Sequence, residues 1–584
     1  MSGIVGGYYF DRSKRIDPQT IEAAKSASTP WGSAGASAVS VPGCFVAQTR
    51  HFGEPSSAEA PAWDSERRLV AVFDGNLQKP QALQTQLSKL GHRFRRKSPA
   101  DLVLAAYRAW GVDCTAHLDG VFAFAVFDRR AHTLFLARDR LGVRPLYVYQ
   151  GAHRLCFASG TQPLLAQGIP RVLDPEAADD FLSFGFVAGT RSLLRDVHPV
   201  SAGGAVYAER RRVQRWSYWS PQFETDGAPG IAECAEALVD ATRSVVADSG
   251  DGAVIALSGG LGAAVIAAAA SERWPAPVRT LTVRWEGGDE AMAASDTARA
   301  LKAMHAVLPR GPAVATAFDD GELPVDAVGL VWRSFAEAMK PHGATVWTGV
   351  GTDVVFGGRS AYHRILKVHG RRWPLRRPLR QSSSLHAADL RAAFVRGIRR
   401  DDHRAWYTQD FLRGLRGYDG ARRCVAEVRA FEGEPLSVLQ HFELTVTMPQ
   451  SLLAILERVE RTTGLRWRLP FFDPVILDLV GSIPARYRLD AGRRELLYRA
   501  AGRVLPPNLI ERPSRGLSPP VGRWLQNDLQ SAVQTRLFGS SSSGLFEPKA
   551  LRRAWYGLML GRAQWASSLM RVATLEGWAQ RVLS

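Results

Sequence analysis

The sequence lacks the features that mark secreted and membrane-embedded proteins. Five cysteines are scattered along 584 residues with no CxxC pair among them, and an odd number argues against a disulfide framework. No window holds about 18 uninterrupted apolar residues, so we expect no transmembrane helix. The first residues have no basic region ahead of an apolar stretch, so we expect no signal peptide. These absences predict a cytoplasmic protein that does not engage a membrane.

Acidic residues are also in short supply. Fifty-six Asp and Glu face 74 Lys and Arg, which gives a net charge of +18. Much of the excess lies in the segment Arg359–Arg404, which includes Arg371, Arg372, Arg376 and Arg377. This run lacks aromatic interleaving of the kind that a single-strand binder would use, which argues against single-stranded nucleic acid. The segment is either a solvated arginine-rich surface or a binding face for an acidic peptide or protein.

The length of the chain exceeds what a single hydrophobic core organises, so we expect two or more domains. Residues 1–219 contain β-branched and aromatic runs separated by turn residues, at 69–73, 121–127 and 133–137, which predict strands. Residues 220–230 are rich in Gly, Pro and polar residues and predict a linker. We expect residues 231–584, after this linker, to form the second domain.

The second domain begins with alternating patterns. Ile231–Ala247 predicts a helix, Val278–Val283 a strand and Ser295–Ala306 another helix. Alternating strands and helices favour a parallel, doubly wound sheet, whose ligands bind at the carboxyl ends of the strands. From about residue 360 onward helical patterns dominate.

One turn in this domain has the layout of a phosphate site. The apolar run Ala253–Ile255 leads into Ser258-Gly259-Gly260, and a helical run follows. Glycines let the backbone approach an anion, and the N–H groups of the following helix point at it. The alternative is a turn with a purely structural role.

Motifs along nearly the whole chain resemble those of class B asparagine synthetases. In the first half they are Gly3–Gly6, Asp119–Ala125 and Ala137–Tyr147; in the second they are Ser258–Gly260, Gly349–Gly358 and Arg468–Asp473. The resemblance implies an N-terminal Ntn-type glutaminase-like α/β/β/α sandwich. It also implies a doubly wound α/β ATP-pyrophosphatase-like domain with helical additions. The family reaction is ATP-dependent amide-bond formation through an acyl-adenylate.

The glutaminase half departs from the family pattern. The family nucleophile is a cysteine at position 2, where this chain has Ser2. A serine hydroxyl needs an activating base that a thiolate does not. Asp74 stands where the family has a substrate-binding asparagine, and Pro99 stands where it has an acidic residue. Arg50 is an isolated candidate for holding a substrate carboxylate. We therefore expect a scaffold without glutaminase activity.

The synthetase half keeps the predicted nucleotide contacts and loses much of the charge chemistry. The resemblance implies nucleotide binding by Leu257, Ser258, Gly259, Gly260, Val283, Thr348 and Gly349. In the Ser-Gly-Gly loop, the family's metal-binding aspartate is replaced by Gly262 and the serine after it by Ala263. Asp353 remains as one weak ligand for Mg²⁺. The family lysine falls at Glu495, next to Arg494, and three family glutamates have become Val350, Val354 and Arg466. We therefore expect ATP to bind weakly and with little dependence on magnesium.

Three functions stay open. The chain is a degenerate family member that acts as a scaffold or binds a partner. Alternatively, it is a repurposed ATP-dependent amide ligase or peptide cyclase, like the lactam-forming and lasso-peptide-cyclase relatives. The third function is ordinary asparagine synthesis, which the lost residues favour least.

Overall fold

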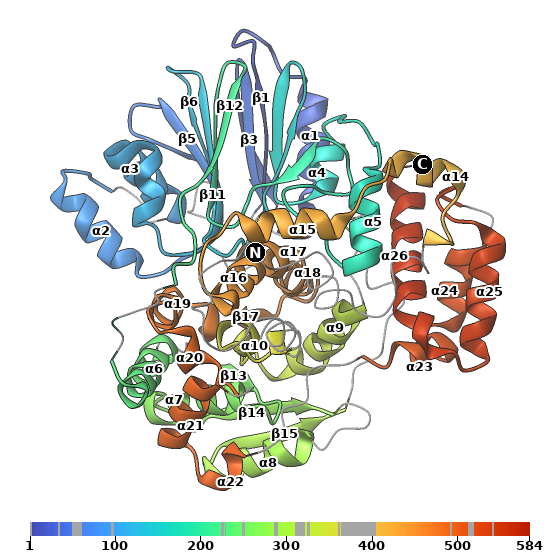
Figure 1. Cartoon of the computed structure of the whole chain (residues 1–584). Helices are drawn as coiled ribbons and strands as arrows, with labels where there is room; N and C mark the ends of the chain where they lie inside the picture. Colours follow the sequence, from blue (N-terminus) through green and yellow to red (C-terminus); the bar gives the residue numbers. More distant parts are fainter. Residues whose placement is uncertain are drawn as a thin grey trace.

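The computed structural model describes residues 3–32, 35–49, 61–94, 98–223, 227, 229–247, 252–284, 290–309, 322–323, 327–359, 362–363, 404–490, 493–511, 519–539 and 542–583. Within these residues, three sheets organise the molecule, and each draws all its strands from one side of residues 220–230. Figure 1 shows the two antiparallel sheets stacked at the top and the parallel sheet below them. All five cysteines are buried and unpaired. No helix in the described part of the chain combines the length and the apolar character needed to cross a bilayer.

The first unit contains two antiparallel six-stranded sheets. The first consists, in order, of β10 (Val197–Pro199), β8 (Tyr147–Gln150), β9 (Arg154–Ala158), β1 (Ile4–Tyr9), β3 (Cys44–Thr49) and β2 (Ala36–Val41). The second consists of β12 (Arg212–Ser217), β11 (Gly204–Glu209), β7 (Thr133–Arg138), β6 (Gly120–Asp128), β5 (Leu69–Leu77) and β4 (Ala62–Trp63).

Strand β6 shows why this unit has four layers. Successive side chains of a strand point to opposite faces. Phe122, Phe124 and Val126 enter the core beneath α2 (Pro80–Lys89) and α3 (Pro99–Trp110), whereas Ala123, Ala125 and Phe127 enter the core between the two sheets. The first sheet is covered by α1 (Pro18–Ala27), α4 (Thr161–Leu165) and α5 (Pro175–Phe184). The expected α/β/β/α sandwich is confirmed.

The second unit contains the expected parallel sheet. Its order is β15 (Met304–Leu308), β14 (Arg279–Val283), β13 (Ala253–Ala256), β16 (Thr345–Thr348) and β17 (Arg466–Arg468). The chain runs outward from β13 to β15 and then returns to the other side of β13 at β16. The topological switch therefore lies between β13 and β16, where ligands of doubly wound sheets bind.

The helices around this sheet include α6 (Ile231–Val246), α7 (Leu261–Arg273), α8 (Glu290–Ala300), α9 (Ala327–Met339) and α10 (Thr352–Val355). Every residue of α7 from Leu261 to Ala270 is buried, as expected for a helix that is apolar all round. The prediction of a helix over Ser295–Ala306 was wrong at its end. The helix stops at Ala300, and Met304–Leu308 pair with β14 as the edge strand.

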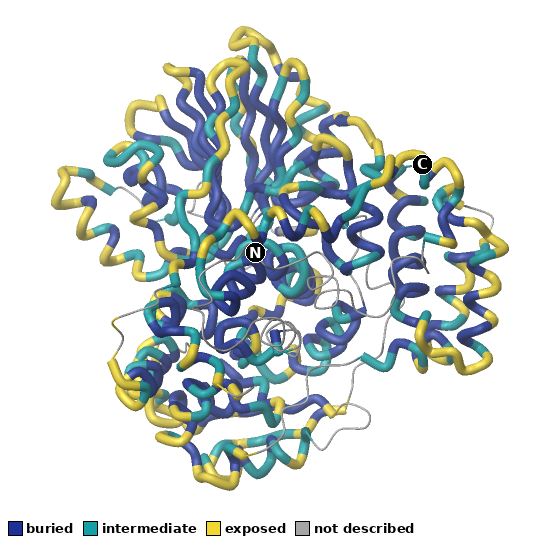
Figure 2. Tube along the Cα trace, in the orientation of Figure 1, coloured by how far each residue is buried: buried dark blue, intermediate teal, exposed yellow. Residues whose placement is uncertain are grey.

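The remaining chain is mainly helical. The helices are α14 (Gln409–Leu415), α15 (Gly420–Arg429), α16 (Pro435–Phe442), α17 (Met448–Gln450), α18 (Leu452–Thr463), α19 (Pro474–Gly481), α20 (Ala485–Arg488), α21 (Glu495–Val504), α22 (Pro507–Ile510), α23 (Val521–Gln526), α24 (Gln530–Phe538), α25 (Pro548–Met559) and α26 (Ala566–Val582). The last four form the red bundle of Figure 1, and α26 packs against α5 of the first unit. Figure 2 shows the inner face of α26 buried and the outer helix α25 exposed on one side.

Candidate active site

The predicted nucleotide contacts converge at the topological switch of the parallel sheet. Leu257 follows β13, Val283 ends β14, and Thr348 ends β16, so all three lie at carboxyl ends of neighbouring strands. The Leu257 N–H donates to the Leu281 carbonyl at 2.8 Å, which fixes the entry of the Ser258–Gly260 turn. The turn passes into the N-terminus of α7, where helical N–H groups favour an anion.

Thr352 fills the space beside the start of α7. A Cβ on Gly262 would lie 3.1 Å from Thr352 Oγ1 and 3.2 Å from the Gly349 carbonyl oxygen, and nearer still to Thr352 Cγ2. Thr352 is held there, because its hydroxyl donates to the Gly349 carbonyl at 3.1 Å. A side chain at position 262 would therefore require Thr352 to shift.

Gly349 closes the same junction from the other strand. A Cβ on Gly349 would lie 2.9 Å from the Gly262 carbonyl carbon and 3.0 Å from Ala263 Cα, and closest of all to Ala263 N. The loop after β16 thus packs directly on the first turn of α7. Gly351 has a positive φ of 101° at the start of α10, a conformation that suits glycine.

Asp353 is the remaining candidate for a metal ligand, and its carboxylate forms an ion pair with Arg494. Arg494 Nη1 donates to Asp353 Oδ1 at 2.7 Å. The arginine side chain is 9% exposed and the aspartate side chain 51% exposed. Among the described residues, no group of three or more His, Cys, Asp or Glu side chains is placed to hold a metal ion. One carboxylate already paired with a guanidinium does not fit the oxygen-rich shell that Mg²⁺ requires.

Glu495 contributes to its own helix. It is the first residue of α21, and it accepts from Arg499 Nε at 2.7 Å, one turn further along. A carboxylate in the first turn also complements the helix dipole. At the other positions where the resemblance places glutamates, Val354 is buried and Val350 packs against the same apolar core, while Arg466 is exposed at the start of β17.

At the glutaminase end, Asp74 is buried within β5. Ser2 and Arg50 lie outside the described residues. Asp74 is 1% exposed and accepts a hydrogen bond from Ser159 Oγ at 3.2 Å. Arg144 Nε lies 4.0 Å from Asp74 Oδ1. Burial raises the pKa of the Asp74 carboxyl to about 6, and the neighbouring Arg144 offsets part of that rise.

Pro99 is the first residue of α3, and the acidic residue of that turn is Asp101. Ser98 and Asp101 form a capping box, in which the Ser98 side chain accepts from the Asp101 N–H and the Asp101 carboxylate accepts from the Ser98 N–H. The Asp101 carboxylate also accepts from Ser98 Oγ at 2.6 Å. The Asp101 carboxylate therefore caps the N-terminus of α3.

The basic segment is anchored at both of its ends. Arg359 Nη1 lies 2.7 Å from a carboxylate oxygen of Glu443, whose side chain is fully buried. Arg404 Nη2 donates to Asp179 Oδ2 of α5 at 2.5 Å. Arg371, Arg372, Arg376 and Arg377 lie outside the described residues.

Two protein-family models match the chain, one in each half. Residues 233–580 match the model of the asparagine synthase family. The chain belongs to the asparagine synthase family. Residues 1–219 match a glutamine amidotransferase domain.

Relatives of this asparagine synthase family member cover most of the chain. Glutamine-hydrolysing asparagine synthetase 1 of Bacillus subtilis is 25% identical over 84% of this chain and 81% of its own length. Asparagine synthetase 3 of the same organism is 24% identical over 86% of each chain. A fungal relative, amidase chyE of Penicillium rubens, is 27% identical over 54% of this chain and 51% of its own length.

The sequence motifs did not indicate the contact between the two halves of this family member. Arg144 Nη2 donates to Glu460 Oε1 of α18 at 3.3 Å, so one guanidinium lies between Asp74 of the first unit and α18 of the second. Glu457 lies one turn earlier on α18 and is also buried. Both glutamates occur in a charged helical stretch whose sequence is typical of a solvated face, so only the packing of α18 identifies them.

Proposed function

We propose that this asparagine synthase family member is degenerate: it hydrolyses no glutamine, makes no asparagine, and acts as a scaffold that binds a partner. The observation that carries the proposal is the filled start of α7. Where the resemblance implies a metal carboxylate, a side chain on Gly262 would collide with Thr352, which would have to shift to admit it. In this proposal, Thr352 packs in the space beside the position of the missing carboxylate.

The charge differences from the family pattern around this turn also argue against catalysis. Preorganised charge usually contributes more to enzyme catalysis than any other single effect. Loss of a metal carboxylate and inversion of a lysine would each cost several kcal/mol of transition-state stabilisation, about three orders of magnitude in rate apiece. Asp353 is held by Arg494, and Glu495 pairs along its own helix. Backbone N–H groups at Ser258–Gly260 remain, which supports weak, magnesium-independent nucleotide binding.

For the partner, we favour an acidic peptide or protein that binds the Arg359–Arg404 segment in the cytoplasm. The terminal arginines of the segment pair with Glu443 and Asp179. Its anchoring at both ends supports a role for the interior arginines in contacting something outside the chain. Such binding would weaken with salt, because exposed charges are screened within about 10 Å at 0.1 M ionic strength.

The test is an ATP–pyrophosphate exchange assay on the purified protein, with aspartate and with candidate carboxylates including peptides. The proposal is supported if no carboxylate gives exchange and if the protein captures a partner in a salt-sensitive pull-down. That capture should be lost when alanine replaces Arg371, Arg372, Arg376 and Arg377. Exchange with aspartate would overturn it in favour of asparagine synthesis. A tight, magnesium-dependent ATP complex would overturn the proposed weak nucleotide binding.

A second candidate is a repurposed ATP-dependent amide ligase or peptide cyclase. The observation that favours it is Arg494, which the structure places beside the Gly349–Gly358 loop, one residue from the position of the family lysine. A guanidinium there offers positive charge to a phosphate. Exchange that requires a peptide carboxylate, and is lost in Arg494→Met but kept in Arg493→Met, would establish this candidate.

A further inference from the structure

The two antiparallel sheets leave a cavity of about 380 Å³ between two of their edges, here called the edge cavity. His198 and Pro199 of β10 line it from the first sheet, and Arg215, Trp216 and Ser217 of β12 line it from the second. A neighbouring cavity of about 350 Å³ continues from it. The residues that line both are Thr190, Pro199, Val200, Ser201 and Ser217. Spaces of this size are large enough for a bound ligand.

Strand β12 presents an open edge at this cavity. The Tyr218 N–H donates to the Gly203 carbonyl at 2.8 Å, at the end of the ladder that joins β12 to β11. Bonded and non-bonded pairs alternate along an antiparallel ladder, so the main-chain N–H and C=O groups of Val213, Arg215 and Ser217 point away from β11. In the part of the chain that the structure describes, these groups have no hydrogen-bond partner, and β12 is the last strand of its sheet. Such an edge is a template for an added strand.

The opposite rim, β10, offers no matching edge. It is a strand of three residues, and its last residue, Pro199, has no N–H to donate. The carbonyl of Val197 already accepts from Ser192 Oγ at 2.8 Å. A strand that enters the edge cavity therefore pairs with β12.

Arg215 adds a cation without an acidic partner to the same cavity. Its Nη2 donates to Gln150 Oε1 on β8 at 2.9 Å, and it forms no ion pair with a carboxylate of a described residue. The acid on the neighbouring strand, Glu209, lies opposite Arg212 and not opposite Arg215. Arg215 is exposed, so its guanidinium is accessible to a ligand.

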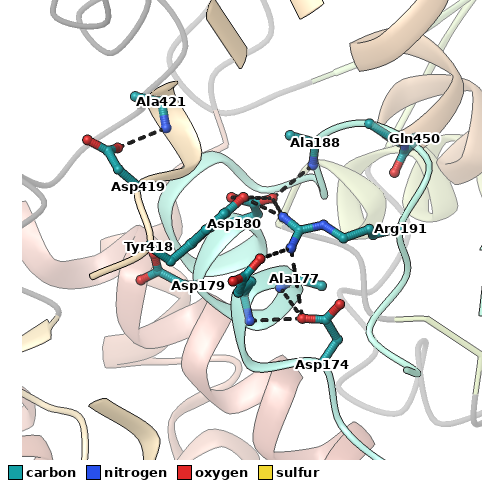
Figure 3. A network of polar contacts seen from close by, with 12 residues as sticks. Asp174, Ala177, Asp179, Asp180, Ala188, Arg191, Tyr418, Asp419, Ala421 and Gln450 are labelled. Atoms are coloured by element: carbon teal, nitrogen blue, oxygen red, sulfur yellow. Dashed lines mark hydrogen bonds and ion pairs between the residues drawn. The ribbon is translucent and has the colours of Figure 1, made fainter. Parts of the chain in front are cut away.

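Arg191 shows how another arginine of the first unit is neutralised. Figure 3 shows its guanidinium pointing toward the acids of α5, among them Asp180, with Asp174 close by. Burial lowers the pKa of Arg191, but Asp180 and the other acids outweigh burial, and the net pKa is raised. For Arg215, partial burial acts without an opposing acid, and the pKa is lowered. A carboxylate is therefore the partner that Arg215 lacks.

The rest of the lining also favours an anion. Among the described residues, no Asp or Glu lines the edge cavity. Its polar side chains apart from Arg215 are Thr190, His198, Ser201 and Ser217, all of a kind that can donate. One carboxylate, Glu427, and one guanidinium, Arg138, line the neighbouring cavity. The Arg138 guanidinium donates to three main-chain carbonyls, so its charge also lacks a bonded carboxylate.

We propose that the edge cavity binds an acidic, extended segment of a partner protein as an antiparallel strand added to β12. The main chain of the segment pairs with Val213, Arg215 and Ser217, and a Glu or Asp side chain accepts from Arg215. Val213 packs toward the core between the sheets, and Arg215 shares its face because alternate residues of a strand do. The segment therefore has an acid at its centre and β-branched residues two positions to either side.

The inference does not rest on the proposed function, because β12 lies outside the Arg359–Arg404 segment and the binding needs no ATP. The probe is a fluorescein-labelled peptide with capped ends, Thr-Val-Thr-Glu-Thr-Val-Thr, titrated with the full-length protein by fluorescence anisotropy. We expect saturable binding that weakens at least about tenfold when Gln replaces the Glu, since charge-assisted hydrogen bonds are the stronger kind. No binding, or equal binding of the Gln peptide, would overturn the proposal.

A change to the peptide main chain separates strand addition from attraction between charges alone. In antiparallel pairing with the Glu opposite Arg215, the N–H groups of the Glu and of both Val point toward β12, and those of the two Thr beside the Glu point away. We expect N-methylation of both Val to abolish binding and N-methylation of those two Thr to preserve it. Equal affinities of the two methylated peptides would contradict the added strand.

Variants of the protein locate the binding. Arg215→Met removes the charge and keeps an extended side chain, and we expect at least about tenfold weaker binding. Its matched control is Arg211→Met in the turn between β11 and β12, which makes the same change in net charge and keeps the affinity. Ser217→Pro removes an outward N–H, leaves the ladder to β11 intact and also weakens binding. The quadruple alanine variant of the proposed partner surface keeps the affinity. Unchanged affinity in an Arg215→Met protein that unfolds cooperatively, or loss of binding in the quadruple variant, would refute the assignment.

Discussion

At the scale of single residues, Gly262 stands where the resemblance implies a carboxylate, and Thr352 fills the space beside it. A Cβ at position 262 would meet the Thr352 side chain. We therefore expect Gly262→Asp to destabilise the protein by about 1–3 kcal/mol, the usual cost of overpacking. The double variant Gly262→Asp/Thr352→Ala should recover most of that loss, because it removes both contacting side-chain atoms. Chemical unfolding of both variants measures the difference.

The double variant also tests the proposed loss of the metal site. We expect it to bind ATP without strong magnesium dependence, because Arg494 still occupies Asp353. Calorimetry with and without magnesium is the measurement. Additive rather than compensating effects of the two substitutions on stability would show that Thr352 does not fill the space of the lost carboxylate.

A second residue-scale prediction concerns Glu457 and pH. Its carboxyl has a pKa of about 7 in the folded protein against an ordinary value of 4.5, with burial as the main cause. Between those values the folded state holds a proton that the unfolded state has released, so this group makes stability fall as pH rises from about 4.5 to 7. The neighbouring charges that modify it are Arg461, Arg144, Asp74 and Glu460.

Glu457→Gln removes this titration. We expect the free energy of unfolding of the variant, relative to the original protein, to increase from pH 4.5 to pH 7 and then level off. Urea unfolding at several pH values gives both curves. The partly buried His441 has a pKa lowered to about 4 and acts in the opposite direction, but it is common to both proteins and cancels in the difference. Parallel curves would refute the prediction.

A third prediction concerns the nucleophile position. The purified protein should release no ammonia from glutamine, and Ser2→Cys alone should not restore release. A thiolate supplies the nucleophile, but Asp74 still presents a buried carboxyl where the family binds substrate with an amide. A coupled assay for ammonia, with the unchanged protein as the baseline, is the measurement. Appreciable hydrolysis by Ser2→Cys would mean that the binding groups are intact.

At the scale of elements, helix α5 holds the end of the basic segment. Arg404 donates to Asp179 at 2.5 Å, and the Asp179 side chain is 3% exposed. We expect Arg404→Met to lower the free energy of unfolding by about 3 kcal/mol, because removing one partner leaves a buried charge. The control is Arg413→Met on α14, whose ion pair with Asp410 is exposed and is worth less than about 1 kcal/mol. Similar effects of the two substitutions would contradict the anchoring role.

The element scale also shows where sequence patterns were sufficient. The apolar run at 121–127 predicted a strand, and the structure places β6 there with both faces buried. The pattern over Ser295–Ala306 was misleading, because residues 304–308 gain their strand conformation by pairing with β14. Pairing partners distant in the sequence leave no local signal in a short edge strand.

At the scale of the whole molecule, the two units share apolar cores. One core joins Val5 of β1 and Phe181 of α5 to Trp524 of α23 and Leu569 of α26. We therefore expect a fragment of residues 1–219 to expose the buried face of α5 and to aggregate or bind a hydrophobic dye, whereas the full chain does neither. Dye fluorescence and gel filtration of the fragment and the full chain measure this. A monomeric, dye-free fragment would show that the first unit folds independently.

The sequence by itself determined the family and both fold classes, because motifs and strand periodicity are local properties. The tertiary structure decided which side chains contact one another. It placed Thr352 in the space beside Gly262, Arg494 on Asp353, and Arg404 on Asp179. It also buried Glu457, whose charged helical surroundings gave no hint of burial. These contacts join residues that are distant in the chain, so only the packed fold brings them together.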